Sequence, residues 1–352
     1  LSEAPSMTKK FILACFLIVI FLNSNIYSEN NRYFEFDKGI IALMYHRFDE
    51  QKYPSTNIQI SIFKEQIELI EKLNINFLNP KDFGKNYTKV NNKKTILITI
   101  DDGFQSFYEK AWPYLKDKKI PFLLFISTEA VGKNGYMNWN QIIEIEKSGL
   151  GIIGNHSHTH GYLADLDNNE TIADIEKSIN IFKNKLGYNP IYFSYPFGEY
   201  SDSLKKIIRD YNFQFAFGQH SGVVDFTKDS LELPRFPINE KYGNIDRFKF
   251  ILNLLPFQFK KNFPENKYLL ENNNPPIVKV IFFKEQRNLD NITCYSNENN
   301  KWRKSKIFFE NENILNIQIE EKFTTERGRI NCSLNDTVGW RWFGLQFVIS
   351  DY

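Results

Sequence analysis

The chain has 352 residues, more than one average domain holds, and 42% of them are apolar, which is enough for two folded cores. Lysine and arginine (44) nearly balance aspartate and glutamate (42), and no long basic run occurs. The net charge of +2 therefore argues against nucleic acid as a partner.

The N-terminal region is typical of a secretory signal peptide, which we expect over 7–28. Met7 is followed by two lysines and by an apolar run, 11–22, that is too short for a comfortable membrane span. Cleavage within 24–28 would leave no membrane span in the mature chain and predicts a periplasmic or extracellular protein. An uncleaved membrane anchor is the alternative, because the flank lacks a clean small-residue cleavage site.

The middle of the chain alternates short apolar runs with segments of helical periodicity. Strands are expected at 39–46, 95–100, 121–126, 151–154, 191–195 and 213–217. Helices are expected at 62–73, 104–118, 140–147, 172–186 and 203–210. This alternation predicts an α/β fold with parallel strands and outer helices, in which functional groups collect at the carboxyl ends of the strands.

Two adjacent carboxylates follow the strand expected at 95–100. Asp101 and Asp102 can take different roles only where the strand frays into a loop, because successive side chains on a strand point to opposite faces. Gly103 permits the turn that such a loop needs. The alternative is an ordinary surface turn.

Three of the five histidines of the chain lie close together in the segment 154–160. His156 and His160 are four residues apart, so one helical turn would place both imidazoles on one face. With one carboxylate they form a set of metal ligands that leaves coordination positions open, as catalytic metals require. His158 would point elsewhere, to a supporting or surface position.

The segments 99–103 and 156–160, in this order and at this separation, resemble the first two motifs of the polysaccharide deacetylases, carbohydrate esterase family four. The likeness extends over about 39–237, and the stretches 44–46 and 195–198 are nearest to the branch that deacetylates poly-β-1,6-N-acetylglucosamine. It implies an incomplete (β/α) barrel of seven units.

The resemblance also implies roles for individual residues. Asp102, His156 and His160 would hold one divalent ion, zinc, with cobalt and nickel as alternatives. Asp101 would be the general base, and the backbone N–H of Phe197 would complete the oxyanion site. The family usually has Tyr at that position, but a backbone donor does not depend on the side chain.

Two departures from the family pattern need substitutes. Many members orient the base with an Arg where this chain has Ser194, and we interpret Arg235 as the replacement, with a surface Arg as the alternative. No histidine follows His220, so the late general acid of the family is absent and His46 is the replacement. The alternative for His46 is a structural histidine bonded to a backbone carbonyl.

The organisation changes in the last third of the chain. A helix over 242–261 would close a catalytic domain expected at 39–262, and 271–276 reads as a linker. Short strand-like runs, 278–283, 306–309, 314–319, 328–334 and 340–349, then predict a small all-β, sandwich-like domain at 277–352. This domain carries none of the motif chemistry, so a chain that ends at 276 is expected to hydrolyse short, soluble substrates if it folds.

Several residues of this expected domain allow two interpretations. Trp302, Trp340 and Trp342 could contact glycan or fill the core. Cys294 and Cys332 could form a disulfide in an oxidising compartment or remain buried thiols.

Taken with the resemblance, the sequence predicts hydrolytic N-deacetylation of an N-acetylglucosamine polysaccharide or oligosaccharide by a metal-activated water. Peptidoglycan and chitin-type oligomers are alternative substrates. A glycan-binding pseudoenzyme without a metal and an unrelated metallohydrolase acting on phosphate are alternative functions. The first is disfavoured because the base and all three ligands are present, and the second would need more charged residues around the metal.

Overall fold

The computed structural model describes residues 39–88, 94–284 and 286–349. The expected signal peptide at 7–28 lies outside these residues. Among the helices of the described part, none combines the length and the apolar character that a membrane crossing requires.

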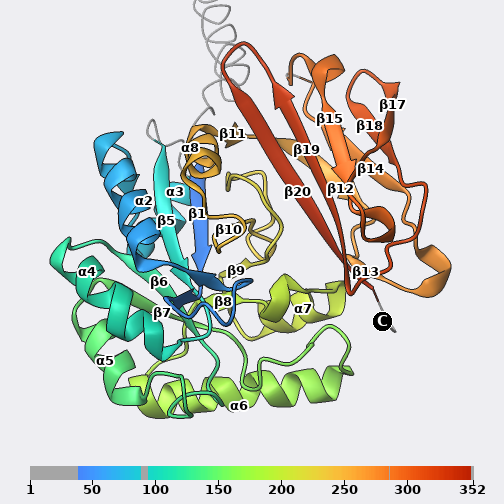
Figure 1. The fold of residues 1–352 in the computed structure, drawn as a ribbon. Helices are drawn as coiled ribbons and strands as arrows, with labels where there is room; N and C mark the ends of the chain where they lie inside the picture. Colours follow the sequence, from blue (N-terminus) through green and yellow to red (C-terminus); the bar gives the residue numbers. More distant parts are fainter. Residues whose placement is uncertain (1–38, 89–93, 285, 350–352) are drawn as a thin grey trace, which may run out of the picture. The chain divides into compact units, whose positions relative to one another are not determined.

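An eight-stranded parallel sheet is built from strands between residues 40 and 237 (Figure 1). Its order is β10 (Phe236–Pro237), β1 (Ile40–Tyr45), β5 (Thr95–Ile100), β6 (Phe122–Ile126), β7 (Gly151–Asn155), β8 (Tyr192–Ser194) and β9 (Phe215–Phe217), with β4 (Asn76–Phe77) paired to β5. Two further short strands, β2 (Arg47–Phe48) and β3 (Asn57–Ile58), pair with each other. The predicted incomplete barrel of parallel strands is confirmed.

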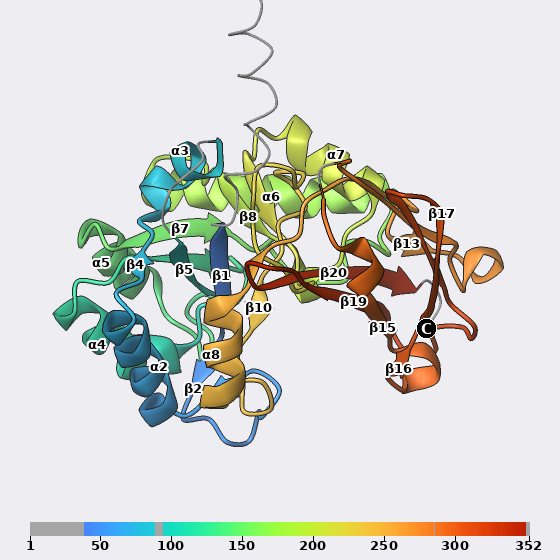
Figure 2. The ribbon, with the colours of Figure 1, turned by 90° about the horizontal axis from the view of Figure 1, so that it is seen from above.

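Helices lie outside the curved sheet, as Figure 2 shows from above. They are α2 (Ile60–Lys72), α3 (Phe83–Thr88), α4 (Trp112–Asp117), α5 (Trp139–Lys147), α6 (Asn168–Leu186), α7 (Asp202–Asp210) and α8 (Ile245–Asn253). Single turns occur at η1 (Pro80–Asp82), η2 (Phe107–Ala111, a π-turn) and η3 (Pro196–Gly198). The longest helix, α6, begins at the N-cap Asp167 with a capping box and ends at the left-handed Gly187.

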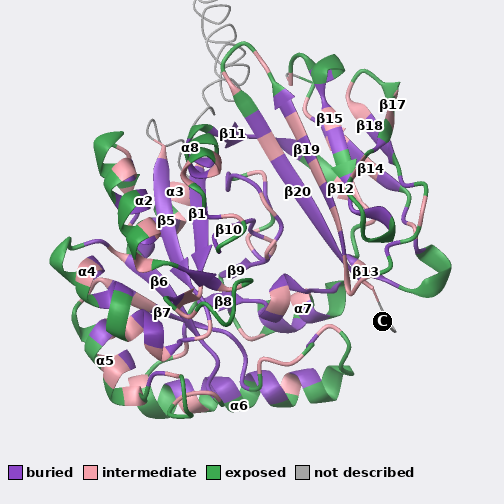
Figure 3. Ribbon diagram, viewed as in Figure 1, coloured by how far each residue is buried: buried purple, intermediate pink, exposed green. Residues whose placement is uncertain are grey.

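Strands β1, β5 and β6 are buried along their whole length, and the figure coloured by burial shows β1 and β5 in purple (Figure 3). In β5, Ile96, Ile98 and Ile100 pack in the cluster that contains the helix residues, whereas Leu97 packs in a second cluster with other strand residues. Side chains alternate along a strand, so Asp101, which follows β5, continues the face of Leu97 rather than that of the helices.

The helix expected over 242–261 is wrong in its second half. Helix α8 ends at Asn253, and β11 (Leu255–Pro256) and β12 (Phe259–Phe263) follow. Proline cannot continue a helix, and the buried Phe257 and Phe259 alternate with Gln258 and Lys260 as in a strand. The all-β region therefore begins at Leu255, upstream of the expected boundary between 262 and 277.

Two further sheets form the C-terminal region. Strand β11, with β13 (Tyr268–Leu269), β15 (Thr293–Ser296), β16 (Arg303–Lys304), β19 (Arg327–Asn335) and β20 (Trp340–Ile349), forms a six-stranded sheet. Strand β12, with β14 (Val278–Phe282), β17 (Lys306–Asn311) and β18 (Ile314–Gln318), forms a four-stranded sheet. Short turns lie at η4 (Glu271–Asn273), η5 (Leu289–Asn291) and η6 (Glu298–Asn300). Buried residues of both sheets form one hydrophobic cluster, as a sandwich requires.

The two cysteines lie in this shared core. Cys294 on β15 and Cys332 on β19 are direct partners in the antiparallel register and form a disulfide. The first interpretation of the cysteine pair is thus confirmed. Of the tryptophans, Trp302 and Trp340 are exposed, whereas the indole N–H of Trp342 donates to Ser221 Oγ at 2.8 Å.

Candidate metal centre

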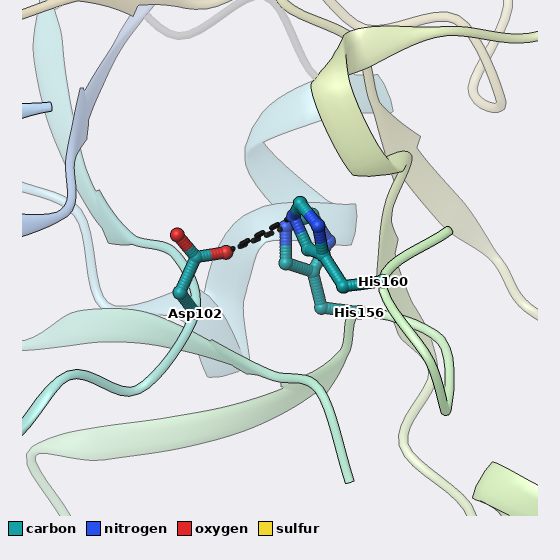
Figure 4. Close-up of side chains that lie close together, drawn as sticks. All are labelled: Asp102, His156 and His160. Atoms are coloured by element: carbon teal, nitrogen blue, oxygen red, sulfur yellow. Dashed lines mark ion pairs between the residues drawn. The ribbon is translucent and has the colours of Figure 1, made fainter. Parts of the chain in front are cut away.

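Asp102, His156 and His160 converge beyond the carboxyl ends of β5 and β7, and Figure 4 shows the carboxylate opposite both imidazole rings. Asp102 Oδ1 lies 3.3 Å from His156 Nε2 and 3.2 Å from His160 Nε2. The three ligand atoms all lie within 4.8 Å of one another. The three residues predicted from the sequence as metal ligands therefore lie together in the folded chain.

The histidines do not lie on a helical turn, which was one way to bring both imidazoles to the same face. Residues 156–160 form an irregular loop, in which Ser157 and His160 have positive φ angles of 68° and 56°. Asp102 also has a positive φ, 72°. Such angles are uncommon for residues other than glycine and persist only where surrounding contacts hold them, which is frequent at functional sites.

Helix α6 supplies those contacts for the histidine loop. Asp174, buried on α6, accepts hydrogen bonds from the backbone N–H groups of His158 and Thr159 and from the Thr159 hydroxyl, at 2.6–3.0 Å. His158 points away from the ligands and bonds to Thr128 Oγ1 through Nδ1 at 2.9 Å. The expectation of a supporting or surface position for His158 matches this placement, but the role of Asp174 was missed.

Two features of the triad fit a divalent ion. His156 Nδ1 lies 2.6 Å from the carbonyl oxygen of Ser194, to which it can only donate, and its Nε2 is the ring nitrogen that faces Asp102. A second ring nitrogen bonded to a backbone carbonyl is the usual arrangement of a metal-ligating histidine. Asp102 Oδ1 is also buried with no hydrogen-bond partner among the described residues.

Asp101 has a different environment from its neighbour. Arg235 donates two hydrogen bonds to Asp101, from Nη1 to Oδ1 at 2.7 Å and from Nη2 to Oδ2 at 2.8 Å. Both side chains are fully buried. Ser194 Oγ donates to Asp101 Oδ2 at 3.2 Å and accepts from Arg235 Nη2 at 2.9 Å. The remaining guanidinium donors reach Gly218 O and Thr99 Oγ1, so all five N–H groups are used.

These contacts keep both carboxylates ionised. Burial opposes ionisation of Asp101, but the Arg235 guanidinium outweighs it and lowers the pKa of that carboxyl. Burial likewise opposes ionisation of Asp102, and the imidazoles of His156 and His160, close to its carboxylate, hold its pKa well below the usual range. The site therefore contains two carboxylates with different partners: Asp101 is bound to Arg235, and Asp102 faces the imidazoles.

His46 follows β1 at the same edge of the sheet. Burial lowers the pKa of its imidazole, and the carboxylates of Asp102 and Asp101 oppose this shift. The lowered pKa favours the neutral ring. A cavity of about 350 Å³ opens beside the ligands and is lined by Asp102, Phe104, Ser127, Glu129, Ala130, Lys133, Tyr136, Thr159 and His160.

Phe197 lies in the turn η3 that follows β8. Its ring contacts the edge of His160, with centroids 4.7 Å apart, and stacks on Tyr162 at 4.3 Å. The turn therefore borders the candidate metal ligand His160 and the stacked Tyr162. His220, the other unassigned histidine, is buried in a separate cavity of about 170 Å³, and burial lowers its pKa to about 4.

Comparisons with known sequences identify relatives. Residues 88–216 match the family described as polysaccharide deacetylase. A protein of Staphylococcus epidermidis named poly-beta-1,6-N-acetyl-D-glucosamine N-deacetylase is 26% identical over 269 residues, which are 66% of this chain and 92% of that protein. A protein of the same name from Staphylococcus aureus is 24% identical over 233 residues, 58% of this chain and 80% of that protein.

Solved structures share the fold. The structure of IcaB from Ammonifex degensii is 26% identical, with a TM-score of 0.53, and the match covers 61% of this chain and 96% of that chain. The Streptococcus pyogenes deacetylase PplD in complex with acetate is 22% identical, with a TM-score of 0.54, over 58% of this chain and 94% of that chain. These likenesses agree with the half-barrel of parallel strands described above.

Proposed function

We infer that this chain, which contains a polysaccharide deacetylase domain, is a hydrolase that removes acetyl groups from an N-acetylglucosamine polysaccharide. We propose a β-1,6-linked polymer as the substrate, because the curated relatives named above carry that activity in their names. The N-terminal pattern at 7–28 supports export, which would bring the protein to a polymer outside the cytoplasm.

One observation carries the proposal: two adjacent carboxylates stand in separate environments beside two imidazoles. Asp102 faces the imidazoles of the candidate metal set, whereas Asp101 is held by Arg235 and Ser194. A hydrolase that activates water with a metal needs this division, since one carboxylate must bind the ion and another must take the proton. The arrangement supports the assignment of both roles.

Amide hydrolysis requires a nucleophilic water, a polarised carbonyl and a proton for the leaving amine. A divalent ion bound at Asp102, His156 and His160 supplies Lewis-acid chemistry, which lowers the pKa of a water to about 7. Zinc is the proposed ion, with cobalt and nickel as alternatives.

The side chains of the chain perform the proton transfers. Asp101 accepts the proton of the water whose oxygen attacks the acetyl carbon, and Arg235 keeps the carboxylate oriented. The Phe197 N–H donates to the carbonyl oxygen as negative charge develops there. The C–N bond then breaks, and His46 returns a proton to the amine, so that acetate and a free amino sugar leave. Burial lowers the pKa of His46, so in this scheme its ring takes up the proton that Asp101 removed from the water and passes it to the amine.

The decisive experiment measures acetate release from β-1,6-linked N-acetylglucosamine oligomers, chitin oligomers and peptidoglycan. Chelation should abolish turnover, and added Zn²⁺, Co²⁺ or Ni²⁺ should restore it. Asp102→Ala should lose metal and turnover together, whereas Asp101→Asn should keep the metal and lose roughly 10²-fold or more in rate. Faster release from chitin or peptidoglycan would reassign the substrate.

Matched variants test the individual roles. His158→Ala should retain the metal because its ring is bonded to Thr128 instead of facing the ligands. His46→Gln should lose most turnover, and His220→Gln should lose little because that ring lines the other cavity. Stoichiometric metal in Asp102→Ala would refute the ligand set. Bound metal without acetate release from any substrate would indicate a glycan-binding pseudoenzyme.

A further inference from the structure

The turn that carries the proposed oxyanion donor is conformationally demanding. Phe197 has a φ of 58° and Gly198 a φ of 72°. Within the turn, the N–H of Gly198 bonds to Tyr195 O and the N–H of Glu199 bonds to Pro196 O. A phenylalanine with a positive φ angle persists only where surrounding residues stabilise that backbone conformation, so contacts from outside the turn are required.

The external contacts to the turn backbone come from the six-stranded sheet that contains β19 and β20 (the C-terminal sheet). Gln346 on β20 is buried, and its Nε2 donates to the carbonyl oxygens of Phe197 and Gly198 at 3.2 Å each. Arg329 pairs with Gln346 in the β19–β20 register and donates from Nε to Gln346 Oε1 at 3.2 Å. This bond turns the amide oxygen toward Arg329 and leaves the amide nitrogen for the turn.

The side chain of Phe197 is contacted from the same sheet. Arg327 lies two residues before Arg329 on β19, so both side chains emerge on one face. Its guanidinium carbon is 5.6 Å from the centroid of the Phe197 ring, and its Nε is 3.4 Å from Glu199 Oε1. Ring contacts from His160 and Tyr162 complete the enclosure.

Other contacts attach this sheet to the barrel. Gly222, in the loop after β9, forms an isolated bridge with Phe343 on β20. In the neighbouring position, the Trp342 indole donates to Ser221 Oγ. Strand β20 is thereby anchored to a loop of the barrel as well as to the turn.

We propose that the C-terminal sheet completes the active site, and that Gln346 and Arg327 are positioning residues for the Phe197 turn. The proposal rests on the proposed function, because it assigns the Phe197 N–H to the oxyanion. Gln346, oriented by Arg329, fixes the peptide planes that follow Phe197, and Arg327 fixes its ring. The N–H is then directed before the substrate arrives, which is how preorganised donors accelerate acyl transfer.

The test replaces Gln346 by leucine, which keeps a similar volume and removes the donor. A displaced donor should lower kcat by roughly 10- to 100-fold, with KM within about twofold and metal content unchanged. Gln318→Leu on β18 is the matched control, because that glutamine is exposed and lies in the other sheet. For the second residue, Arg327→Met should reduce kcat and Arg327→Lys should recover most of it.

A readout independent of turnover separates this proposal from the proposed function. Amide hydrogen exchange of residues 195–200 should accelerate in Gln346→Leu and stay unchanged in Gln318→Leu. If the wild-type protein deacetylates none of the substrates, the proposed function fails. The exchange measurement would still show whether Gln346 holds the Phe197 turn.

Two results would overturn the proposal. One is wild-type kcat and wild-type exchange at 195–200 in Gln346→Leu. The other is faster exchange throughout the protein together with loss of metal, which would make Gln346 a general structural residue. If Gln346→Leu does not fold, Arg327→Met provides the same test, because the Arg327 side chain is partly exposed and its replacement should be tolerated. Unchanged kcat and unchanged exchange at 195–200 in Arg327→Met would then overturn the proposal.

Discussion

Arg235 and Asp101 form the most consequential single contact in the site, because both are completely buried. Removing the guanidinium would leave a buried carboxylate without its partner, which costs roughly 3–5 kcal/mol in comparable pairs. We therefore expect Arg235→Met to lose that much stability in urea unfolding. Turnover should fall by at least about 10²-fold, because Asp101, the proposed base, loses its orientation and its pKa rises.

A double-mutant cycle provides the control for this pair. Asp101→Asn removes the buried charge, so Arg235→Met in that background should cost less stability than in the wild type. Equal costs in the two backgrounds would show that the pair is not coupled. Arg235→Lys should fall between wild type and Arg235→Met, because a lysine cannot make the bidentate contact.

Glu199 gives the molecule a pH dependence that can be predicted in sign. Burial raises the pKa of its carboxyl to about 7, and Arg327 only partly opposes the shift. Between about pH 4.5 and 7 the folded chain keeps a proton that the unfolded chain releases, so stability decreases as the pH rises through this window. Through Glu199, the free energy of unfolding should be lower at pH 7 than below pH 4.5 by up to about 3 kcal/mol.

Glu199→Gln tests this sign directly. The amide cannot ionise, so the free energy of unfolding should vary less between pH 4.5 and 7 than in the wild type. Chemical denaturation at four or five pH values in this window measures the difference. Parallel curves for the two proteins would contradict the prediction.

The sequence could identify ligands by residue type and spacing, but it could not identify the residues that support them. Asp101, Asp102 and the two histidines would carry the proposed chemistry in their own side chains, and they lie in short motifs. Ser194 and Asp174 act through folded contacts with partners 93 and 15–16 residues away, and serine and aspartate are common residues. Arg235 was reached only because the usual position holds Ser194.

At the scale of elements, helix α6 holds the histidine loop through Asp174. Asp174→Asn keeps one acceptor oxygen and replaces the other by a donor, so at least one of its bonds to the loop must break. We expect metal affinity to fall by roughly 10- to 100-fold, the usual scale for contacts that orient ligands. Competition with a chromogenic chelator measures it, and Asn180→Ala on the exposed face of α6 is the control. Equal affinity in both variants would contradict the role.

Local pattern predicted some elements better than others. The bounds of β5 match the apolar run because β-branched residues buried on both faces leave no other conformation equally favourable. The spacing of the two histidines allowed a helical turn, but spacing cannot reveal the positive φ angles of Ser157 and His160 that bring the rings together in a loop. The end of α8 was missed because the apolar residues after it suit either a helix or a strand, and pairing with β20 decides.

At the scale of the whole molecule, the all-β region and the barrel share contacts that the sequence could not show. Strands β11 and β13 both pair with β20, and β12 pairs with β14. The chain therefore crosses into the C-terminal sheets before the segment that reads as a linker. The expectation that a chain ending at 276 keeps its activity on short substrates no longer follows from the structure.

Two truncations make this argument testable. A chain that ends at 276 retains β11, β12 and β13 without their partners and exposes Phe257, Phe259 and Leu269, all of which are buried in the intact protein. Unpaired strands with apolar side chains promote association between molecules, so we expect this chain to aggregate on size-exclusion chromatography. A chain that ends at 254 lacks those strands and should remain more soluble.

Both truncated chains lack Gln346 and Arg327, so neither should approach full-length turnover on short oligomers even when metal is bound. The comparison separates two reasons for failure, because aggregation affects the longer truncation and a displaced Phe197 turn affects both. A monomeric chain ending at 276 with full-length turnover would show that the C-terminal sheets are dispensable for catalysis. A soluble, metal-bound chain ending at 254 with low kcat and near-normal KM is the result that the contacts to Phe197 predict.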